Sequence, residues 1–156
     1  MLFRSQFHFA ALSADLPGAP LHEFPGFTSS VCQLRPTSRG YLTINSADPM
    51  ARPEIHPGYL STEHDRRTVV AALRVTRKIA EQPALKQFIV AEYKPGAAVQ
   101  SDEALLEFAR DHGVTIFHPA GTCKMGVGSD AVVDPTLKVR GVHGLRDRKS
   151  TRLNSS

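Results

Sequence analysis

The stretch that decides the fold is residues 61–80, which read STEHDRRTVVAALRVTRKIA. A hydroxyl at Ser61 or Thr62 can accept a hydrogen bond from the free amides at a helix start. Glu63 and Asp65 then favour the positive end of the helix dipole. Apolar side chains recur at helical spacing, and this stripe consists of Val69, Leu73, Thr76 and Ala80, broadened by Val70 and Ile79. We therefore predict an amphipathic helix that ends before Pro83.

A second helix is predicted from about Ser101 to His112. Ser101 is a plausible cap, acidic residues follow it in the first turn, and the side chains expected to face inward are Leu105, Phe108 and Ala109. Gly113 is expected to end this helix in the left-handed conformation. The apolar residues 114–117 directly after it indicate a short strand.

Four further segments are predicted to be extended. Residues 6–9 form a short strand, and residues 29–35 and 41–46 alternate between apolar and polar side chains. Because a turn-like stretch, PTSRG at 36–40, lies between the last two, we expect them to pair as antiparallel strands. Breakers at Pro49 and Pro53 leave room only for a short extended piece at residues 54–56. With these strands and helices, we expect an α+β fold.

Length and composition restrict the class of protein. The chain has 156 residues, 41% hydrophobic and 22% charged, which suits one ordinary domain. No run of 18 apolar residues is present, so no transmembrane segment is predicted. The amino terminus resembles no secretory leader. Two cysteines, Cys32 and Cys123, suit a reducing compartment, so we expect a cytoplasmic location and leave membrane association of a complete enzyme open.

The net charge of +4 does not indicate a nucleic-acid partner. No aromatic platform or recognition motif accompanies the basic residues. We expect the basic residues of the first helix to form a solvated face: Arg66, Arg67, Arg74, Arg77 and Lys78. Residues 147–156 supply +2 of the +4, and this polar decapeptide, DRKSTRLNSS, resembles non-native sequence.

Candidate chemistry is concentrated at residues 115–126, TIFHPAGTCKMG. His118 follows an apolar run, and an imidazole there is suited to proton transfer near neutral pH. From spacing alone a structural histidine remains the simpler interpretation. A Cys–His pair with Cys123, a metal site that includes His112, and a phosphate-binding role for Gly126-Val-Gly128 are weaker alternatives. Lys124 is expected to be a solvated surface residue.

Ordered motifs along the chain resemble those of the glucose-methanol-choline (GMC) oxidoreductases, and among them the choline dehydrogenase-like alcohol dehydrogenases. The most specific are FHPAGTCKMG at 117–126 and VVDPTLKVRG at 132–141. The others are QFHF at 6–9, LRPTSRG at 34–40, SADP at 46–49, YLSTE at 59–63, QPAL at 82–85 and QSDE at 100–103. The resemblance covers about residues 5–146.

This resemblance implies a fold and a reaction. The fold is the C-terminal substrate domain of the family, an antiparallel or mixed sheet with helices packed on one face. The reaction is oxidation of a small-molecule alcohol, with hydride passing to N5 of FAD. His118 resembles the active-site base, or the group that stabilises the developing alkoxide, and Pro119 is expected near the flavin ring. No metal is implied.

The same resemblance predicts that residues 1–146 are a partial domain of a longer enzyme. The N-terminal FAD-binding domain, with its Gly-x-Gly-x-x-Gly turn, is not in this sequence, so it is the expected partner. The family's second active-site residue is also absent, and Asn154 does not replace it. We expect the isolated fragment to be inactive and prone to aggregate through exposed apolar surface.

Two alternatives stay open at this point. The isolated chain could serve only as a non-catalytic binding or structural module. As an enzyme, it could belong to a GMC member that acts on sugars or uses oxygen as the electron acceptor. The residues leave the particular alcohol, the electron acceptor and the oligomeric state undetermined.

Overall fold

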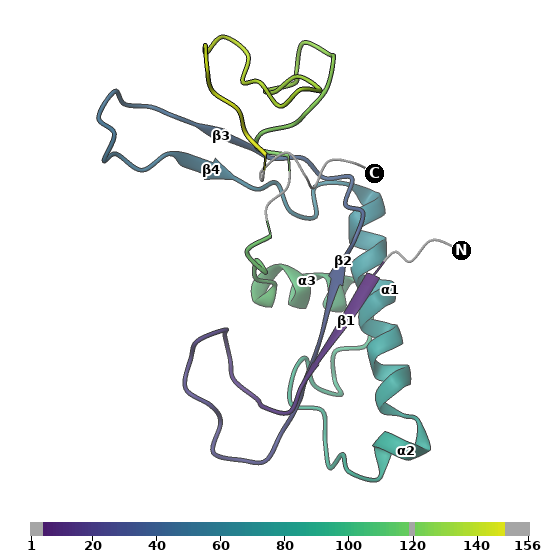
Figure 1. Cartoon of the computed structure of the whole chain (residues 1–156). Helices are drawn as coiled ribbons and strands as arrows, with labels where there is room; N and C mark the ends of the chain where they lie inside the picture. Colours follow the sequence, from purple (N-terminus) through teal and green to yellow (C-terminus); the bar gives the residue numbers. More distant parts are fainter. Residues whose placement is uncertain (1–4, 119–120, 149–156) are drawn as a thin grey trace. The chain divides into compact units, whose positions relative to one another are not determined.

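A computed structural model describes residues 5–118 and 121–148 of the chain (Figure 1). The chain divides into two compact units, Met1–Val114 and Thr115–Ser156. The described part of the first unit contains all the named elements. In chain order these are β1 (Ser5–Ala10), β2 (Thr28–Gln33), β3 (Tyr41–Thr43), β4 (Glu54–His56), α1 (Glu63–Ala80), α2 (Pro83–Lys86) and α3 (Asp102–His112). Two small antiparallel sheets with helices confirm the α+β prediction.

The long helix α1 begins and ends as its sequence predicts. The Thr62 hydroxyl accepts a hydrogen bond from the backbone N–H of Asp65 at 3.3 Å, which satisfies one free amide of the first turn. The helix α3 begins in the same way, because Ser101 Oγ accepts from the backbone N–H of Ala104 at 3.1 Å. Both N-caps could be read from the sequence since each contact spans only three residues.

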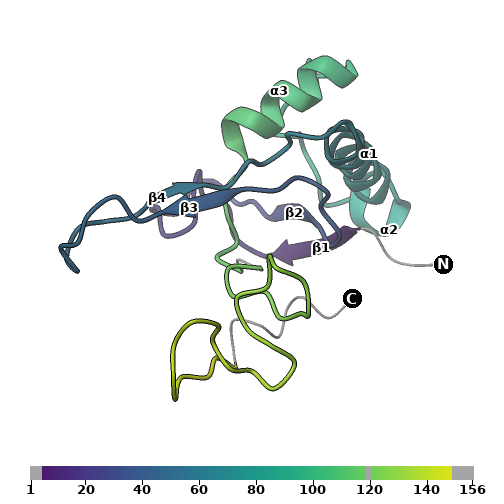
Figure 2. The ribbon, with the colours of Figure 1, turned by 90° about the horizontal axis from the view of Figure 1, so that it is seen from above.

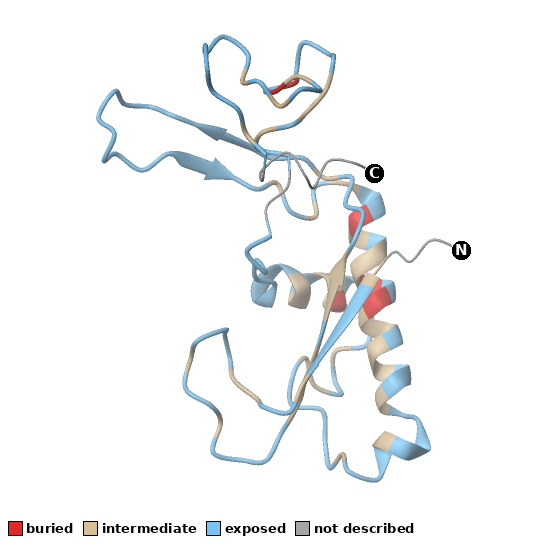
Figure 3. Ribbon diagram, in the orientation of Figure 1, coloured by how far each residue is buried: buried red, intermediate tan, exposed pale blue. Residues whose placement is uncertain are grey.

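The core of the first unit lies where α1 meets β2 and α3. Figure 2 shows both long helices on the same side of the β1–β2 ribbon. Val70 and Ala72 of α1 are buried, and Leu105 of α3 is completely enclosed (Figure 3). Of the predicted stripe, Val70 is buried and Ile79 is exposed, and the other members are partly buried: Val69, Leu73, Thr76 and Ala80.

The predicted pairing of the second and third strands is wrong. β2 pairs with β1, where Gln6 is opposite Cys32, and β3 pairs with β4, where Leu42 is opposite Ile55. The loop between β2 and β3 is bound to the start of α1 and so cannot close a hairpin turn. At Gly40 the chain passes so close to β4 that an added Cβ would lie 2.1 Å from the carbonyl oxygen of His56.

Gly113 ends α3, but not in the predicted left-handed conformation. Its φ of −69° and ψ of 130° are extended, and its backbone N–H donates to the carbonyl of Ala109 at 3.0 Å. A Cβ at this position would lie 2.4 Å from that same carbonyl oxygen. Glycine is therefore required here because the backbone approaches closely. A left-handed cap would also select glycine, so the sequence cannot distinguish the two causes.

Three of the five basic residues of α1 do not form the predicted solvated face. Arg77 donates to the carbonyls of Val99 at 2.7 Å and Gly96 at 3.1 Å and pairs with Glu92. Arg74 bonds Asp102 and the carbonyl of Gln100, and Arg66 bonds the carbonyls of Leu60 and Ser61. These guanidinium groups hold loops against α1, because their planar array of donors can satisfy several carbonyls together.

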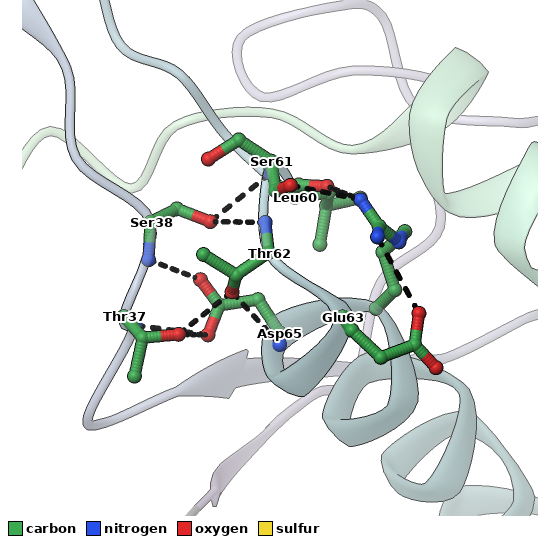
Figure 4. A network of polar contacts seen from close by, with 8 residues as sticks. Thr37, Ser38, Leu60, Ser61, Thr62, Glu63 and Asp65 are labelled. Carbon is green, nitrogen blue, oxygen red and sulfur yellow. Dashed lines mark hydrogen bonds and ion pairs between the residues drawn. The ribbon is translucent and has the colours of Figure 1, made fainter.

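A buried carboxylate ties the β2–β3 loop to α1 (Figure 4). Asp65 is 1% exposed, and its Oδ1 accepts from the Thr37 amide at 2.9 Å and from Gln33 Nε2 at 2.9 Å. Its Oδ2 accepts from the Ser38 amide at 2.7 Å, and Ser38 Oγ in turn accepts from the amide of Ser61 at 3.0 Å. The sequence analysis placed Asp65 only at the helix dipole and missed this role.

The stability contributed by Asp65 is expected to fall in acid. Burial alone would raise its pKa, but the hydrogen bonds from Ser38, Thr37 and Gln33 outweigh burial and hold the pKa well below the ordinary value of 3.8. The unfolded chain therefore takes up the proton at higher pH than the folded chain does. The contribution is complete above about pH 5 and is lost progressively as the pH falls through about 4 and below.

Urea unfolding of the native chain and of Asp65→Asn at pH 7, 5, 4 and 3 checks this expectation. The difference in unfolding free energy between the two proteins should be largest at pH 7 and should shrink toward pH 3. The exposed carboxylates titrate in both proteins and cancel in this difference. A difference that stays constant across the series would show that the ionised form of Asp65 carries no stability.

Candidate active site

The segment that leads to His118 is a bend with an unusual backbone. Residues 114–117 do not form the predicted strand, and the side chains of Val114 and Ile116 are about half exposed. Phe117 has a φ of 58°, in the left-handed region that a bulky residue seldom adopts, and its N–H donates to Thr115 Oγ1 at 3.0 Å. No described strand offers these residues a ladder of hydrogen bonds, so the apolar run remains an irregular chain.

His118 follows this strained residue directly and is exposed. No hydrogen bond or ion pair joins its imidazole to another described residue, and each ring nitrogen can donate or accept one hydrogen bond, depending on the tautomer. Strained non-glycine backbone is concentrated at functional sites, where surrounding structure over-determines an unfavourable conformation. Pro119, the expected neighbour of the flavin, lies outside the described residues.

The chain after His118 is anchored by a small core of its own. Val133 is fully buried and bridges to both Met125 and Val139, and the backbone N–H of Gly126 donates to the carbonyl of Val133 at 3.0 Å. Gly121 has a φ of 93°, so glycine is needed to turn the chain at that point. The segment that follows the histidine is therefore held at several points within the second unit.

Lys124 is half exposed and does not stand alone on the surface. Its ammonium pairs with the carboxylate of Asp130, and this contact lowers the pKa of Asp130 below its ordinary value. Lys124 is therefore exposed, as predicted, but its ion pair with Asp130 was not predicted. The pair closes the turn at residues 124–130 on the scaffold that follows His118.

The alternative chemistries find little geometry in their favour. Among residues 5–118 and 121–148, no group of three or more His, Cys, Asp or Glu side chains could hold a metal ion. No described helix is long and apolar enough to cross a membrane.

The backbone of Phe117 is the part of this site that sequence reasoning missed. A phenylalanine in an apolar run gives no signal of positive φ, since that conformation is most often adopted by glycine or asparagine. His118 itself was singled out as catalytic only through its motif. The structure thus adds a physical feature, a strained turn that presents the imidazole, to a residue chosen by resemblance.

The sequence profile of the GMC oxidoreductases matches residues 36–146. The chain belongs to the GMC oxidoreductase family, whose members are FAD-dependent flavoproteins. Recognition of the family from the sequence motifs is thereby confirmed.

Known proteins similar to this chain are whole enzymes of several activities. An oxygen-dependent choline dehydrogenase of Escherichia coli O45:K1 is 43% identical over 141 residues, which cover 90% of this chain and 25% of that protein. The crystal structure of pyridoxine 4-oxidase from Mesorbium loti superposes with a TM-score of 0.77 at 29% identity, covering 90% of this chain and 27% of its own. A formate oxidase structure gives a TM-score of 0.79 at 27% identity, with 92% and 26% covered. The chain thus spans about a quarter of the length of these proteins.

Proposed function

We propose that this chain is the substrate-side part of a flavin-dependent alcohol dehydrogenase and that His118 takes the proton of the substrate hydroxyl. The observation that carries the proposal is the exposed imidazole of His118, presented by the strained Phe117 inside a motif of an oxidoreductase family. FAD bound to the complete enzyme would supply the acceptor for the hydride from the alcohol carbon.

The role of His118 is acid–base chemistry. An alcohol gives up hydride more readily as its oxygen loses the proton, because the developing alkoxide pushes electrons toward the carbon–hydrogen bond. An imidazole nitrogen within hydrogen-bond reach of the hydroxyl can accept that proton, or can donate to the oxygen in the reverse direction. No residue among 5–118 and 121–148 competes with the substrate hydroxyl for this nitrogen.

The residues of this chain fit the substrate side of a flavin site and do not fit the side that binds the dinucleotide. The sequence has no Gly-x-Gly-x-x-Gly turn, so a dinucleotide pyrophosphate would be held by another part of the polypeptide. Large apolar side chains of the described first unit favour such a covering part. The most exposed are Val90, which is fully exposed, Met50 at 85%, Ile44 at 77% and Phe88 at 74%. We propose that residues 1–146 belong to a longer chain whose FAD-binding domain covers this surface, and that residues 147–156 are foreign to it.

The similarity to choline dehydrogenases favours a small alcohol, and choline is the first candidate. Recognition of its quaternary ammonium would need aromatic faces, and this chain has no tryptophan and only three tyrosines. Most of that recognition would therefore come from the rest of the enzyme. Sugars as substrates and oxygen as the electron acceptor are outcomes that the same experiment distinguishes.

The test is to express the coding sequence that flanks and includes this chain. The purified product is expected to show the absorbance of bound flavin and to lose it when mixed anaerobically with choline, with a sugar and a simple primary alcohol as comparisons. Readmission of oxygen or of an artificial acceptor then separates an oxidase from a dehydrogenase. A complete product that folds and carries no flavin would favour a binding or structural module instead.

A further inference from the structure

The second unit carries a basic hollow at residues 134–146. The hollow has a volume of about 550 Å³ and is lined by Asp134 and by residues 138–146. The side chains of Lys138, Arg140 and Arg146 bring three positive charges to it, His143 lies on the same loop, and Asp134 brings one negative charge. The net charge of residues 134–146 at neutral pH is therefore +2. The whole chain carries a net charge of +4.

Two of these cationic residues lie opposite each other on neighbouring backbone segments. Lys138 and Arg146 are direct partners in an antiparallel bridge. Side chains at such positions have Cβ atoms about 5 Å apart, and like charges placed there destabilise the pair. The repulsion is relieved if an anion binds between them.

The hydrogen bonds that position two of these cations end on neutral carbonyls, and a carboxylate near Arg140 outside the hollow, Asp130, is already paired with Lys124. Arg146 Nη1 donates to the carbonyl of Thr136 at 2.9 Å, and Arg140 Nη2 donates to the carbonyl of Gly126 at 2.9 Å. Both acceptors are uncharged. The ammonium of Lys138 makes no hydrogen bond or ion pair within residues 5–118 and 121–148.

The single carboxylate that lines the hollow is already engaged. Asp134 Oδ1 accepts from the Thr136 amide at 2.7 Å, from Thr136 Oγ1 at 2.7 Å and from the Lys138 amide at 3.0 Å. These hydrogen bonds, Thr136 first, together with the charge of Lys138 hold the pKa of Asp134 below its ordinary value. Asp134 therefore stays ionised as the support of the turn, and it balances only one of the three cations.

We propose that this hollow binds a small multivalent anion of the pyrophosphate or phosphorylated-metabolite class. Guanidinium groups fixed by carbonyls match the geometry of phosphate oxygens, and the hollow is of the size that holds a small ligand. Gly141 and Gly144 leave open space where a side chain would lie, so the anion can approach the backbone. The site involves neither His118 nor a flavin, and so it does not depend on the proposed reaction.

The test uses inorganic pyrophosphate as the probe and the full chain carrying Lys149→Gln and Arg152→Gln, which removes two of the three basic residues of the tail. Titration followed by NMR is expected to give saturable shifts confined to residues 134–146. Lys138→Gln should weaken binding about fivefold or more. Lys78→Gln, which removes an exposed lysine from α1 in the other unit, should leave the affinity unchanged.

A second measurement separates a built site from general attraction of anions. Pyrophosphate should raise the melting temperature of the native chain and raise that of Lys138→Gln less, because only binding to the folded state stabilises it. Without pyrophosphate, Lys138→Gln should be at least as stable as the native chain, since it loses the opposed like charge. Unsaturable shifts, equal losses in the two variants, or binding of polyglutamate without binding of pyrophosphate would each overturn the proposal.

Discussion

Replacing Asp65 with alanine is expected to lower the unfolding free energy of the chain by about 3 kcal/mol or more. The carboxylate is buried and accepts hydrogen bonds from the amides of Thr37 and Ser38 and from Gln33 (Figure 4). Alanine would leave these donors without their acceptor, which is 1% exposed in the native chain. Each unsatisfied buried donor costs roughly 1 to 3 kcal/mol, so the loss exceeds that of an ordinary surface hydrogen bond.

Urea unfolding at pH 7 measures the loss, and hydrogen exchange locates it. The amides of Thr37 and Ser38 should lose their protection in Asp65→Ala while those in the middle of α1 keep theirs. Asp102→Ala is the matched control, because this carboxylate also lies in the first turn of a helix and is hydrogen-bonded, but it is 68% exposed. Its removal should cost less than about 1 kcal/mol. An equal loss of unfolding free energy in the two variants would mean that the burial of Asp65 does not increase its contribution to stability.

The contrast between α1 and the sheets shows what the sequence could predict. Both helix starts depend on a hydroxyl and an amide three residues apart, so local sequence determines them. Strand pairing depends on where the β2–β3 loop is bound, and that is decided by Asp65, 28 residues after Thr37. Alternation identifies a strand but carries no information about its partner. The hairpin was therefore predicted between segments that are locally compatible and yet belong to different sheets.

The candidate site also has one feature that the sequence predicts and one that it does not. A motif identified His118, whereas the positive φ of Phe117 has no signature in the residue type. The basic hollow escaped notice for a related reason. Lys138 and Arg146 are eight positions apart and become opposed only through the bridge between their segments. Charges that look scattered along a sequence gather when a short loop folds back on itself.

Replacing His118 with alanine in the complete enzyme is expected to slow the reduction of bound flavin by alcohol about 10² to 10⁴-fold. Flavin content should stay at the native level, because the exposed ring bonds none of the described residues. Anaerobic stopped-flow mixing with a saturating alcohol measures the step directly. His64→Ala serves as the control, since His64 is an exposed histidine on α1, and its rate should match that of the native enzyme.

The pH profile distinguishes proton transfer from a merely structural role for His118. If the imidazole of the native enzyme takes the hydroxyl proton, the substrate bound to the alanine variant must instead give that proton to water or hydroxide. Its rate should then rise with pH over a range where the native enzyme has already levelled off, so the deficit narrows in alkali. A histidine that only supported the turn at Phe117 would lower the rate by the same factor at every pH. Flavin reduction at nearly the native rate in His118→Ala would remove the residue from the chemistry altogether.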